Sequence, residues 1–412
     1  MRSGFLNFIK DRGYLYQCTN LEGLDKLMSS STVVAYIGFD CTAPSLHIGS
    51  LIQIMMLRHL QQFGHKAIIL LGGGTTKIGD PTGKDKAREI LDKNTISSNI
   101  SRIKKTLEKF ISLEGAILVN NADWLNSLKY IDFLRDVGIH FSINRMLNFE
   151  SVKTRLEREQ SLSFLEFNYM LLQAYDFVEL SRNYGCRLQI GGSDQWGNIV
   201  NGIELGNKLN MPELFGLTTP LITTTAGKKM GKTAEGKTIW LDSEMCSPYD
   251  YWQYFRNIED NNLGYFLRLF TELSLDKIKK LESLIGQEIN EAKKALATGA
   301  TKICHGEDAA KDAERAAVAN FENKDSSLLP SVYIEKQKIG DVGISAVELL
   351  HITDLVDSKG AAKRFIEGGG CRINDKIISN LNQLVTLKDF DASGFIKLSV
   401  GKKRHIRVIL LF

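Results

Sequence analysis

Strand-like and helix-like patterns of apolar residues alternate through the first half of the chain. Residues 31–39 (STVVAYIGF) have the β-branched, aromatic character of a buried strand, residues 51–63 (LIQIMMLRHLQQF) are helical, and residues 66–74 (KAIILLGGG) form a second strand that ends in glycines. This succession predicts a βαβ unit with a parallel sheet. Ligands of such sheets bind at the carboxyl ends of the strands, so residues 40–50 lie in the expected crevice.

The rest of the chain extends this plan. Further strands are expected over residues 115–121, 186–192 and 218–225, and helices over 130–141 and 164–185. From Ser247 to about Asn323 the pattern is almost wholly helical, and a polar stretch with a proline (323–331) is typical of a linker. The last block predicts two short helices, then a strand after Gly370. We therefore expect a Rossmann-like α/β domain (1–246), an all-helical domain (247–325) and a small α+β domain (340–412).

Composition narrows the function classes. The 412 residues carry a net charge of +4, with no apolar stretch of about 18 residues that could span a bilayer and no apolar block of a signal peptide near the start. These features predict a cytoplasmic protein without membrane association. The six cysteines are isolated, and no Cys or His spacing is typical of zinc, so we expect reduced core cysteines and no protein-bound metal.

The positive charge is concentrated in the tail. Residues 335–412 contain thirteen Lys or Arg and nine Asp or Glu, which accounts for the whole excess of 52 over 48 in the chain. Such an excess is compatible with an ordinary solvated surface, or with a module that binds a polyanion.

Two segments approach the pattern of a phosphate-binding Walker loop. Residues 79–84 (GDPTGK) and 227–233 (GKKMGKT) are each one residue too short, and the residues after Thr233 do not have a helical pattern. No Gly-x-Gly-x-x-Gly follows a strand. The sequence thus disfavours both a Walker-type nucleotide site and a dinucleotide site of the usual kind.

The segment HIGS (47–50) offers a different nucleotide site. His47 at the entrance of a helix can donate to a phosphate, and Gly49 would let an adenine ring lie against the helix backbone. A histidine there is by itself more often structural. The functional interpretation gains support from KMGKT (229–233), a glycine-containing loop with two lysines three residues apart after the last expected strand.

HIGS and KMGKT resemble the HIGH and KMSKS signatures of class I aminoacyl-tRNA synthetases. Four longer stretches, YIGFDCTAPSLHIG, IGDPTGK, SFLEFNYMLLQAYDF and LQIGGSDQWGNI, are similar to the bacterial tyrosyl-tRNA synthetases, and the resemblance covers essentially the whole chain. Ser50 replaces the second signature histidine, which puts that position's contribution to nucleotide binding in question. Gly231 and Thr233 replace the two serines of KMSKS, while both lysines remain.

The resemblance implies activation of L-tyrosine by ATP and transfer of the tyrosyl group to tRNA(Tyr), with Mg²⁺ bridging phosphate oxygens mostly through water. It implies catalytic roles for residues that contact the phosphates: Thr42, His47, Lys84, Arg88, Lys229, Lys232 and Thr233. ATP or the adenylate would also contact Gly38, Asp40, Gly49, Ser50, Gly192, Asp194 and Lys232.

Tyr169, Gln173 and Asp176 fall at i, i+4 and i+7, so a helix places all three on one face. A polar stripe between apolar residues suggests a polar ligand. The resemblance assigns tyrosine binding to Tyr36, Asp80, Tyr169, Gln173, Asp176 and Gln195, with Tyr36 and Asp176 at the phenolic hydroxyl. It also implies a homodimer with its interface around residues 120–165, an anticodon-side role for the helical domain, and a tail that resembles a small RNA-binding domain of ribosomal proteins. The tRNA contacts expected there are Lys359, Lys363, Arg364 and Arg372.

Three alternatives stay open at this point. A relative of the same class that activates tryptophan shares the motifs, a plain nucleoside triphosphate hydrolase would use the glycine-rich loops, and a non-enzymatic RNA-binding protein would need only the tail.

Overall fold

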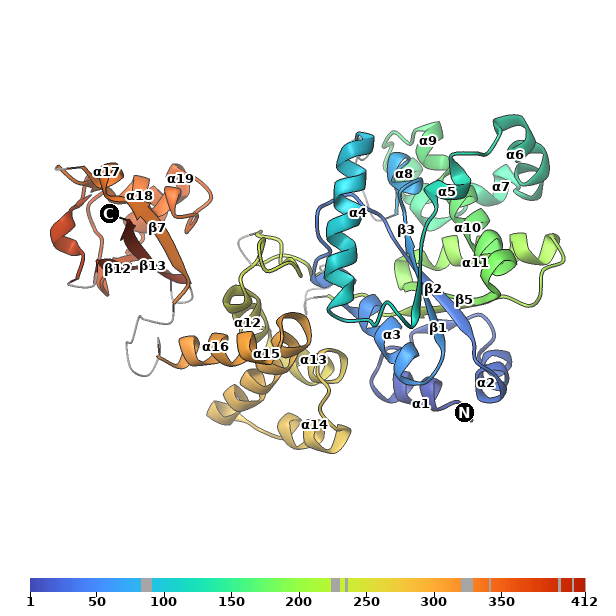
Figure 1. The fold of residues 1–412 in the computed structure, drawn as a ribbon, viewed down its shortest axis with the longest axis horizontal. Coiled ribbons are helices and arrows are strands. Elements are labelled where there is room, and N and C mark those ends of the chain that lie inside the picture. The colour runs from blue at the N-terminus through green and yellow to red at the C-terminus, as the bar shows by residue number, and fades with distance from the viewer. Residues whose placement is uncertain are drawn as a thin grey trace. The chain divides into compact units, whose positions relative to one another are not determined.

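The computed structural model describes residues 1–82, 91–223, 230–233, 236–319, 329–340, 342–391, 394–401 and 404–411, with the side chains of residues 150 and 151 left out. The described chain forms two compact units, one of Met1–Cys246 with Ile258–Cys304 and one of Ser247–Asn257 with His305–Phe412 (Figure 1). The three domain boundaries expected from the sequence stay a prediction. Among the described residues, no helix is both long and apolar enough to span a membrane.

The first unit is built on a six-stranded sheet with the order β1-β6-β5-β2-β3-β4, in which all neighbours are parallel except β1 and β6. The predicted parallel-sheet α/β fold is therefore confirmed. The strands are β1 Gln17–Cys18, β2 Val34–Phe39, β3 Lys66–Leu71, β4 Ala116–Asn120, β5 Cys186–Gly192 and β6 Phe215–Thr219.

Helices cover the sheet and extend beyond it (Figure 1). Those of the first unit are α1 Gly4–Asp11, α2 Leu21–Ser30, α3 Leu51–Gln62, α4 Lys93–Glu108, α5 Ala122–Leu125, α6 Tyr130–Asp136, α7 Ile143–Met146, α8 Glu150–Glu157, α9 Phe164–Phe167, α10 Tyr169–Tyr184, α11 Trp196–Lys208, α13 Leu263–Phe270, α14 Leu275–Glu282 and α15 Ile289–His305. The last residue of α15, His305, is also the first residue of the segment His305–Phe412 of the second unit.

Most expected elements appear, and three differ. The strand expected over 218–225 lies at Phe215–Thr219, because Pro220 has no N–H to continue a ladder inside a sheet. The helix expected over 130–141 ends at Asp136 and is followed by a 3-10 turn at Gly138–His140. The helix expected over 164–185 is divided at Asn168 into α9, which begins with a capping box of Ser163 and Glu166, and α10.

Helix α13 is fastened to the sheet unit by buried polar groups. The Arg12 guanidinium donates to the carbonyls of Arg268 at 2.9 Å and Thr271 at 2.8 Å, and the Tyr14 hydroxyl donates to Leu269 O. The last carbonyls of a helix have no backbone N–H partner in that helix. Arg12 and Tyr14 therefore satisfy acceptors that burial would otherwise leave unpaired. The first helices after residue 257 thus belong to the same compact unit as the sheet.

The second unit contains two helices, α12 Pro248–Arg256 and α16 Glu307–Val318, that pack on each other, and a small α+β module. The module has helices α17 Lys336–Ile339, α18 Ala346–Ile352 and α19 Lys359–Glu367. Its five-stranded sheet has the order β10-β9-β12-β13-β7. These strands are β7 Ser331–Glu335, β9 Cys371–Ile373, β10 Lys376–Ile377, β12 Phe395–Val400 and β13 Arg404–Leu411, and a separate pair is formed by β8 Ile344–Ser345 and β11 Leu384–Val385.

Candidate active site

The sheet of the first unit has a switch point between β2 and β5. The chain runs from β2 outward through β3 to β4, then returns to the other side of β2 as β5. Loops that leave these two neighbours diverge, which opens a crevice at the carboxyl ends of the strands. Gly38 and Asp40 lie at this end of β2, and Gly192 and Asp194 lie at this end of β5. The structure therefore brings together four residues that the sequence assigned to the nucleotide and adenylate.

Asp40 links β2 to α10, the helix with three of the residues that the sequence resemblance assigned to tyrosine binding. Its carboxylate accepts from Thr75 Oγ1 at 2.8 Å and from the Tyr169 hydroxyl at 3.1 Å. Gly72 allows this approach, because a methyl group there would lie 2.3 Å from Asp40 Oδ1. Burial raises the pKa of Tyr169 well above its usual range, and the carboxylates of Asp40, Asp80 and Asp176 raise it further, so its hydroxyl is a constant donor.

The predicted polar face of α10 exists. Tyr169, Gln173 and Asp176 all lie on this helix, and Asp176 is only 1% exposed. Its carboxylate accepts from Trp124 Nε1 at 2.7 Å and from Asn121 Nδ2 at 2.9 Å. Burial raises the pKa of Asp176 to about 7, although both hydrogen bonds act in the opposite direction. A buried carboxyl that titrates near neutrality is typical of a functional site.

Tyr36 lies beside this carboxyl. Its ring packs at 5.2 Å from the Phe177 ring, and its pKa is raised well above the usual range by burial and then by the charge of Asp176. The Tyr36 hydroxyl is buried and has no hydrogen-bond partner among the described residues. An unpaired buried hydroxyl is costly, so this atom indicates a ligand with a polar group at the same depth as Asp176.

A second chain of polar side chains lies on the β5 side of the crevice. Gln195 Nε2 donates to Asp80 Oδ2 at 2.8 Å, and Gln195 Oε1 accepts from Asn198 Nδ2 at 3.0 Å and from Gln173 Nε2 at 3.4 Å. Gln173 Oε1 is buried without a partner among the described residues. A carboxylate and a free amide oxygen are acceptors suited to an ammonium group.

His47 takes a defined tautomer at the start of α3. Its Nδ1 accepts from the backbone N–H of Gly49 at 2.9 Å, so the neutral ring carries its proton on Nε2, and the side chain is exposed. A methyl group at residue 49 would lie 2.6 Å from His47 Cε1, so glycine is needed for this ring position. Ser50 follows at the helix entrance without a side-chain cap bond.

The two signature segments meet through residues 238–241. The backbone N–H of Ile48 donates to Ile239 O at 3.0 Å, and the N–H of Ile239 donates to Gly231 O at 3.0 Å. Lys232 pairs with Thr238 as an isolated bridge, and its side chain is exposed. A methyl group at Gly231 would lie 3.9 Å from His47 Nδ1. His47 and the Lys232 loop are thus on the same side of the unit.

The remaining predicted positions are less informative. Thr42 is half-buried in the loop after β2, and the Thr233 backbone N–H donates to Lys237 O at 2.7 Å. Lys84, Arg88 and Lys229 lie outside the described residues. In the second unit, Lys359, Lys363 and Arg364 are exposed on α19, where Lys359 forms an ion pair with Glu348, and Arg372 is half-buried on β9.

Sequence reasoning missed the residues that surround Asp176 and Asp40. Thr75, Asn121 and Trp124 make the contacts described above, and Asn121 also donates to Thr75 Oγ1 at 3.0 Å. The available signal was the pair of asparagines at the end of the fourth strand, Asn120 and Asn121, at the same sheet edge as the other site residues. Gln189 on β5 was also missed; its Oε1 is buried without a partner among the described residues, and it pairs in register with Tyr36.

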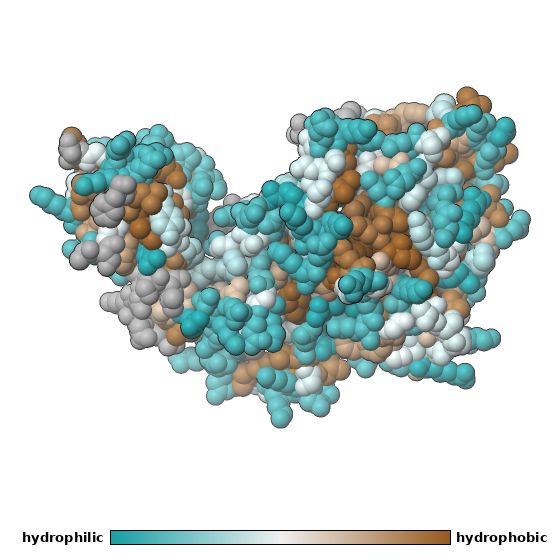
Figure 2. Space-filling model, in the orientation of Figure 1, coloured by the Kyte–Doolittle hydropathy of each residue, from teal (hydrophilic) through white to brown (hydrophobic). Residues whose placement is uncertain are grey.

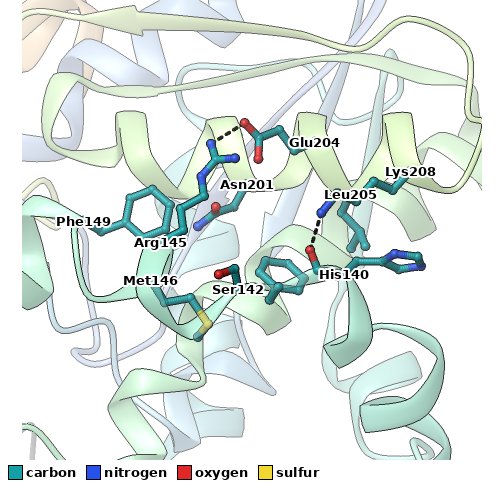
Figure 3. Close-up of a pocket in the computed structure, with 10 residues that line it drawn as sticks. His140, Ser142, Arg145, Met146, Phe149, Asn201, Glu204, Leu205 and Lys208 are labelled. Carbon is teal, nitrogen blue, oxygen red and sulfur yellow. Dashed lines mark hydrogen bonds and ion pairs between the residues drawn. The ribbon is translucent and has the colours of Figure 1, made fainter.

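A separate cavity of about 140 Å³ lies between α11 and the segment from His140 to Phe149 (Figure 3). An ion pair of Arg145 with Glu204 and a hydrogen bond of 2.6 Å from Lys208 Nζ to His140 O cross it. None of the predicted site residues lines this cavity.

Comparison with known proteins decides the family. Residues 28–322 match the model of the class I tRNA synthetases for tryptophan and tyrosine. The tyrosine–tRNA ligase of Wolbachia sp. subsp. Brugia malayi (strain TRS) is 67% identical over 99% of both chains. The chain belongs to the tyrosyl-tRNA synthetases.

Other relatives agree with this assignment. The tyrosine–tRNA ligase of Ehrlichia ruminantium (strain Gardel) is 61% identical over 100% of this chain and 99% of its own length. A C-terminally truncated mitochondrial tyrosyl-tRNA synthetase of Aspergillus nidulans, solved by crystallography, is 30% identical with a TM-score of 0.68 and covers 77% of this chain and 94% of its own. The sequence-based recognition and enzyme class are confirmed.

Proposed function

We propose that the crevice between β2 and β5 binds L-tyrosine and ATP, forms tyrosyl-adenylate, and passes the tyrosyl group to the 3'-terminal adenosine of tRNA(Tyr). The observation that carries this proposal is the buried pair of Asp176 and Tyr36, which offers a carboxylate acceptor and an unpaired hydroxyl at one depth. A phenolic hydroxyl both donates and accepts, so it would satisfy the two groups together.

This pair argues for tyrosine over the alternatives. Phenylalanine has no polar group to reach Asp176 or Tyr36. The indole of tryptophan only donates, so it would leave the Tyr36 hydroxyl unpaired. Because a buried polar group without a partner costs about 1–3 kcal/mol, either competitor binds less well.

The α-ammonium group would lie against Asp80, Gln173 and Tyr169. Asp80 supplies charge and Gln173 Oε1 supplies an unpaired acceptor, while the Tyr169 hydroxyl is committed to Asp40. With the ring and the ammonium fixed at two points, the carboxylate is directed toward the opening of the crevice, where Asp40, Gly192 and Asp194 lie. Fixing the reactants in this way contributes to the rate by removing the need for a chance encounter.

Adenylate formation needs no proton acceptor, because the tyrosine carboxylate is already an anion at neutral pH. A carboxylate oxygen forms a bond to the α-phosphorus as the bond from that phosphorus to the pyrophosphate oxygen breaks. Negative charge develops on pyrophosphate, and the site must stabilise it with donors and cations. We assign this role to Thr42, to the Nε2–H of His47, to Lys229, Lys232 and Thr233, and, from the other side, to Lys84 and Arg88. Mg²⁺ enters as part of the ATP substrate.

The adenosine end would occupy the backbone surface at Gly38, Gly49 and Gly192. Gly38 is exposed although its neighbours in β2 are buried, so one face of the central strand is open at that point. The side-chain-free backbone of Gly49, with Ser50 beside it, can accept a flat ring. Asp40 and Asp194 would accept from ribose hydroxyls.

The experiment that tests this function is amino-acid-dependent exchange of pyrophosphate into ATP. We expect exchange with tyrosine and none above background with phenylalanine or tryptophan. Exchange with tryptophan alone would refute the specificity, and steady ATP hydrolysis without an amino acid would favour a hydrolase. A Lys232→Ala variant that keeps full exchange would remove the catalytic role of the loop and leave an RNA-binding function.

We also propose a homodimer that uses the segment around residues 120–165. Among the described residues, eight of nineteen exposed large apolar side chains lie between 130 and 165: Tyr130, Ile131, Ile139, Ile143, Leu147, Leu156, Phe164 and Leu165. Brown, apolar residues are visible at the upper right of Figure 2, where α6 to α9 lie in Figure 1. Apolar side chains gathered in this way are typical of an interface. We further propose a cytoplasmic location, which the similarity to the tyrosine–tRNA ligases of the bacteria Wolbachia and Ehrlichia supports.

For tRNA, we assign the first contacts of the tail to α19 and β9. Lys359, Lys363 and Arg364 are exposed on the helix, and Arg372 is half-buried on the strand. Such cations bind phosphates and set affinity more than sequence choice.

A further inference from the structure

The five-stranded sheet of the tail module has two faces of different character. Residues that alternate along a strand point to opposite faces. One face joins the module's core with α17, α18 and α19: Ile334, Cys371, Ile373, Ile396, Leu398, Val400 and Val408. The three helices lie together on one side of the strands (Figure 1). The other set of side chains therefore points away from these helices.

The register of the strands arranges this second set in three rows. Ser399 pairs with His405 and Arg372, and Lys397 pairs with Arg407, which pairs with Ser331. The third row contains Phe395, Ile409 and Tyr333. Paired residues share a face, so two rows bear basic side chains and the adjoining row is aromatic and aliphatic.

Contacts within the face keep the cations in place. The Arg407 guanidinium lies 5.3 Å from the centroid of the Phe395 ring, and its Nε donates to Ser331 Oγ at 3.2 Å. His405 Nδ1 lies 2.9 Å from Ser399 Oγ. Lys397 is buried and paired with Asp375 at 3.1 Å, so among the described residues of this face the guanidinium groups of Arg372 and Arg407 are the cations that can meet a ligand.

An ordinary solvated sheet face would carry polar side chains without exposed rings. Here the Tyr333 side chain is 60% exposed at the edge strand β7, in the same row as Phe395. Aromatic rings next to a basic groove are the combination that binds unpaired nucleotides, because every base can stack and every phosphate is an anion. A duplex offers phosphates but no base faces, so the rings favour a single strand.

We propose that this sheet face, defined by Arg372, Arg407, His405, Phe395 and Tyr333, is a second RNA-binding surface that stacks unpaired bases. It is distinct from the cations of α19. The inference goes beyond the proposed function, and it rests on that function only in taking RNA as the polyanion.

The test uses the full chain and a fluorescein-labelled twelve-nucleotide oligouridine, with binding measured by anisotropy. Tyr333→Ala should weaken binding about tenfold, the effect expected for the loss of one stacked base. Arg407→Gln should reduce the slope of log affinity against log salt by about 0.7. A blunt duplex of the same length should bind the parent and the Tyr333→Ala variant equally.

Lys338→Gln on α17 is the matched control, since it removes an exposed cation from the helix side of the same module, outside the assigned tRNA contacts, and should leave oligouridine binding within twofold. Tyrosine-dependent pyrophosphate exchange needs no RNA, so it should be unchanged in all three variants and reports separately on the proposed active site. Unchanged oligouridine affinity in both Tyr333→Ala and Arg407→Gln would overturn the proposal. It would be equally overturned by an equal loss of duplex binding in Tyr333→Ala, or by a change in oligomeric state showing that the face binds a second copy of the chain.

Discussion

Replacing Asp176 by asparagine should make the protein more stable at high pH while it damages tyrosine recognition. The pKa of Asp176 is raised from 3.8 to about 7, chiefly by burial. A carboxyl with a raised pKa in the folded state is penalised for ionising there. The penalty grows as pH rises above the unfolded-state value, and it is complete once pH has passed through the folded-state value. Asparagine does not titrate, so it escapes this penalty.

The magnitude follows from the two pKa values. One pKa unit corresponds to about 1.4 kcal/mol, so the penalty on the parent is about 2 kcal/mol at pH 5 and about 4 kcal/mol at pH 8. The free energy of unfolding of Asp176→Asn, minus that of the parent, should therefore increase by roughly 2–3 kcal/mol between these pH values. The hydrogen bonds from Asn121 and Trp124 also change, since the new amide can accept only one of them well. That loss, about 1–3 kcal/mol, is the same at both pH values and cancels in the comparison.

Urea denaturation followed by tryptophan fluorescence measures this difference at pH 5 and pH 8. Asp123→Asn is the matched control, because the same chemical change is made at an exposed residue beside Trp124. Its stability difference from the parent should change by less than about 0.5 kcal/mol, as is usual for surface substitutions. If the difference for Asp176→Asn does not grow with pH, then burial does not hold this carboxyl near neutrality, and the reasoning about the pocket fails.

Three further outcomes are expected. His47→Asn should lower the maximal rate of pyrophosphate exchange by a factor on the order of a hundred, the effect of losing one transition-state donor; a tyrosine dissociation constant that changes equally, measured by equilibrium dialysis, would contradict its assignment to the phosphates. The kcat/KM for tyrosine should fall as pH drops through about 7, because Asp176 becomes protonated. Trp124→Phe should shift the midpoint of this pH profile upward, because it removes a hydrogen-bond donor to the ionised carboxylate. An unchanged midpoint would assign the titration to another group. Ile139→Asp should shift the chain toward monomers in sedimentation velocity, because the side chain is 74% exposed in the apolar segment; a dimer of unchanged dissociation constant would place the interface elsewhere.

Local sequence patterns determined the elements that carry the site. Residues 34–39, 51–62 and 66–71 form the expected strand, helix and strand, because runs of buried apolar residues and their 3.6-residue period are properties of contiguous sequence. The common face of Tyr169, Gln173 and Asp176 followed from helix geometry alone. The family resemblance supplied the order of the motifs along the whole chain.

Tertiary structure alone decided which distant side chains meet. Asp176 lies 55 positions from Asn121 in the chain, and Tyr169 lies 129 positions from Asp40, yet each pair is hydrogen-bonded. These contacts depend on the strand order, in which β2 lies between β5 and β3, and no local pattern encodes that order. The same holds for Ile239, whose backbone hydrogen bonds join Ile48, the residue after His47, to Gly231. The raised pKa of Asp176 is likewise a result of packing, since desolvation is set by all the atoms that surround a group and not by its neighbours in sequence.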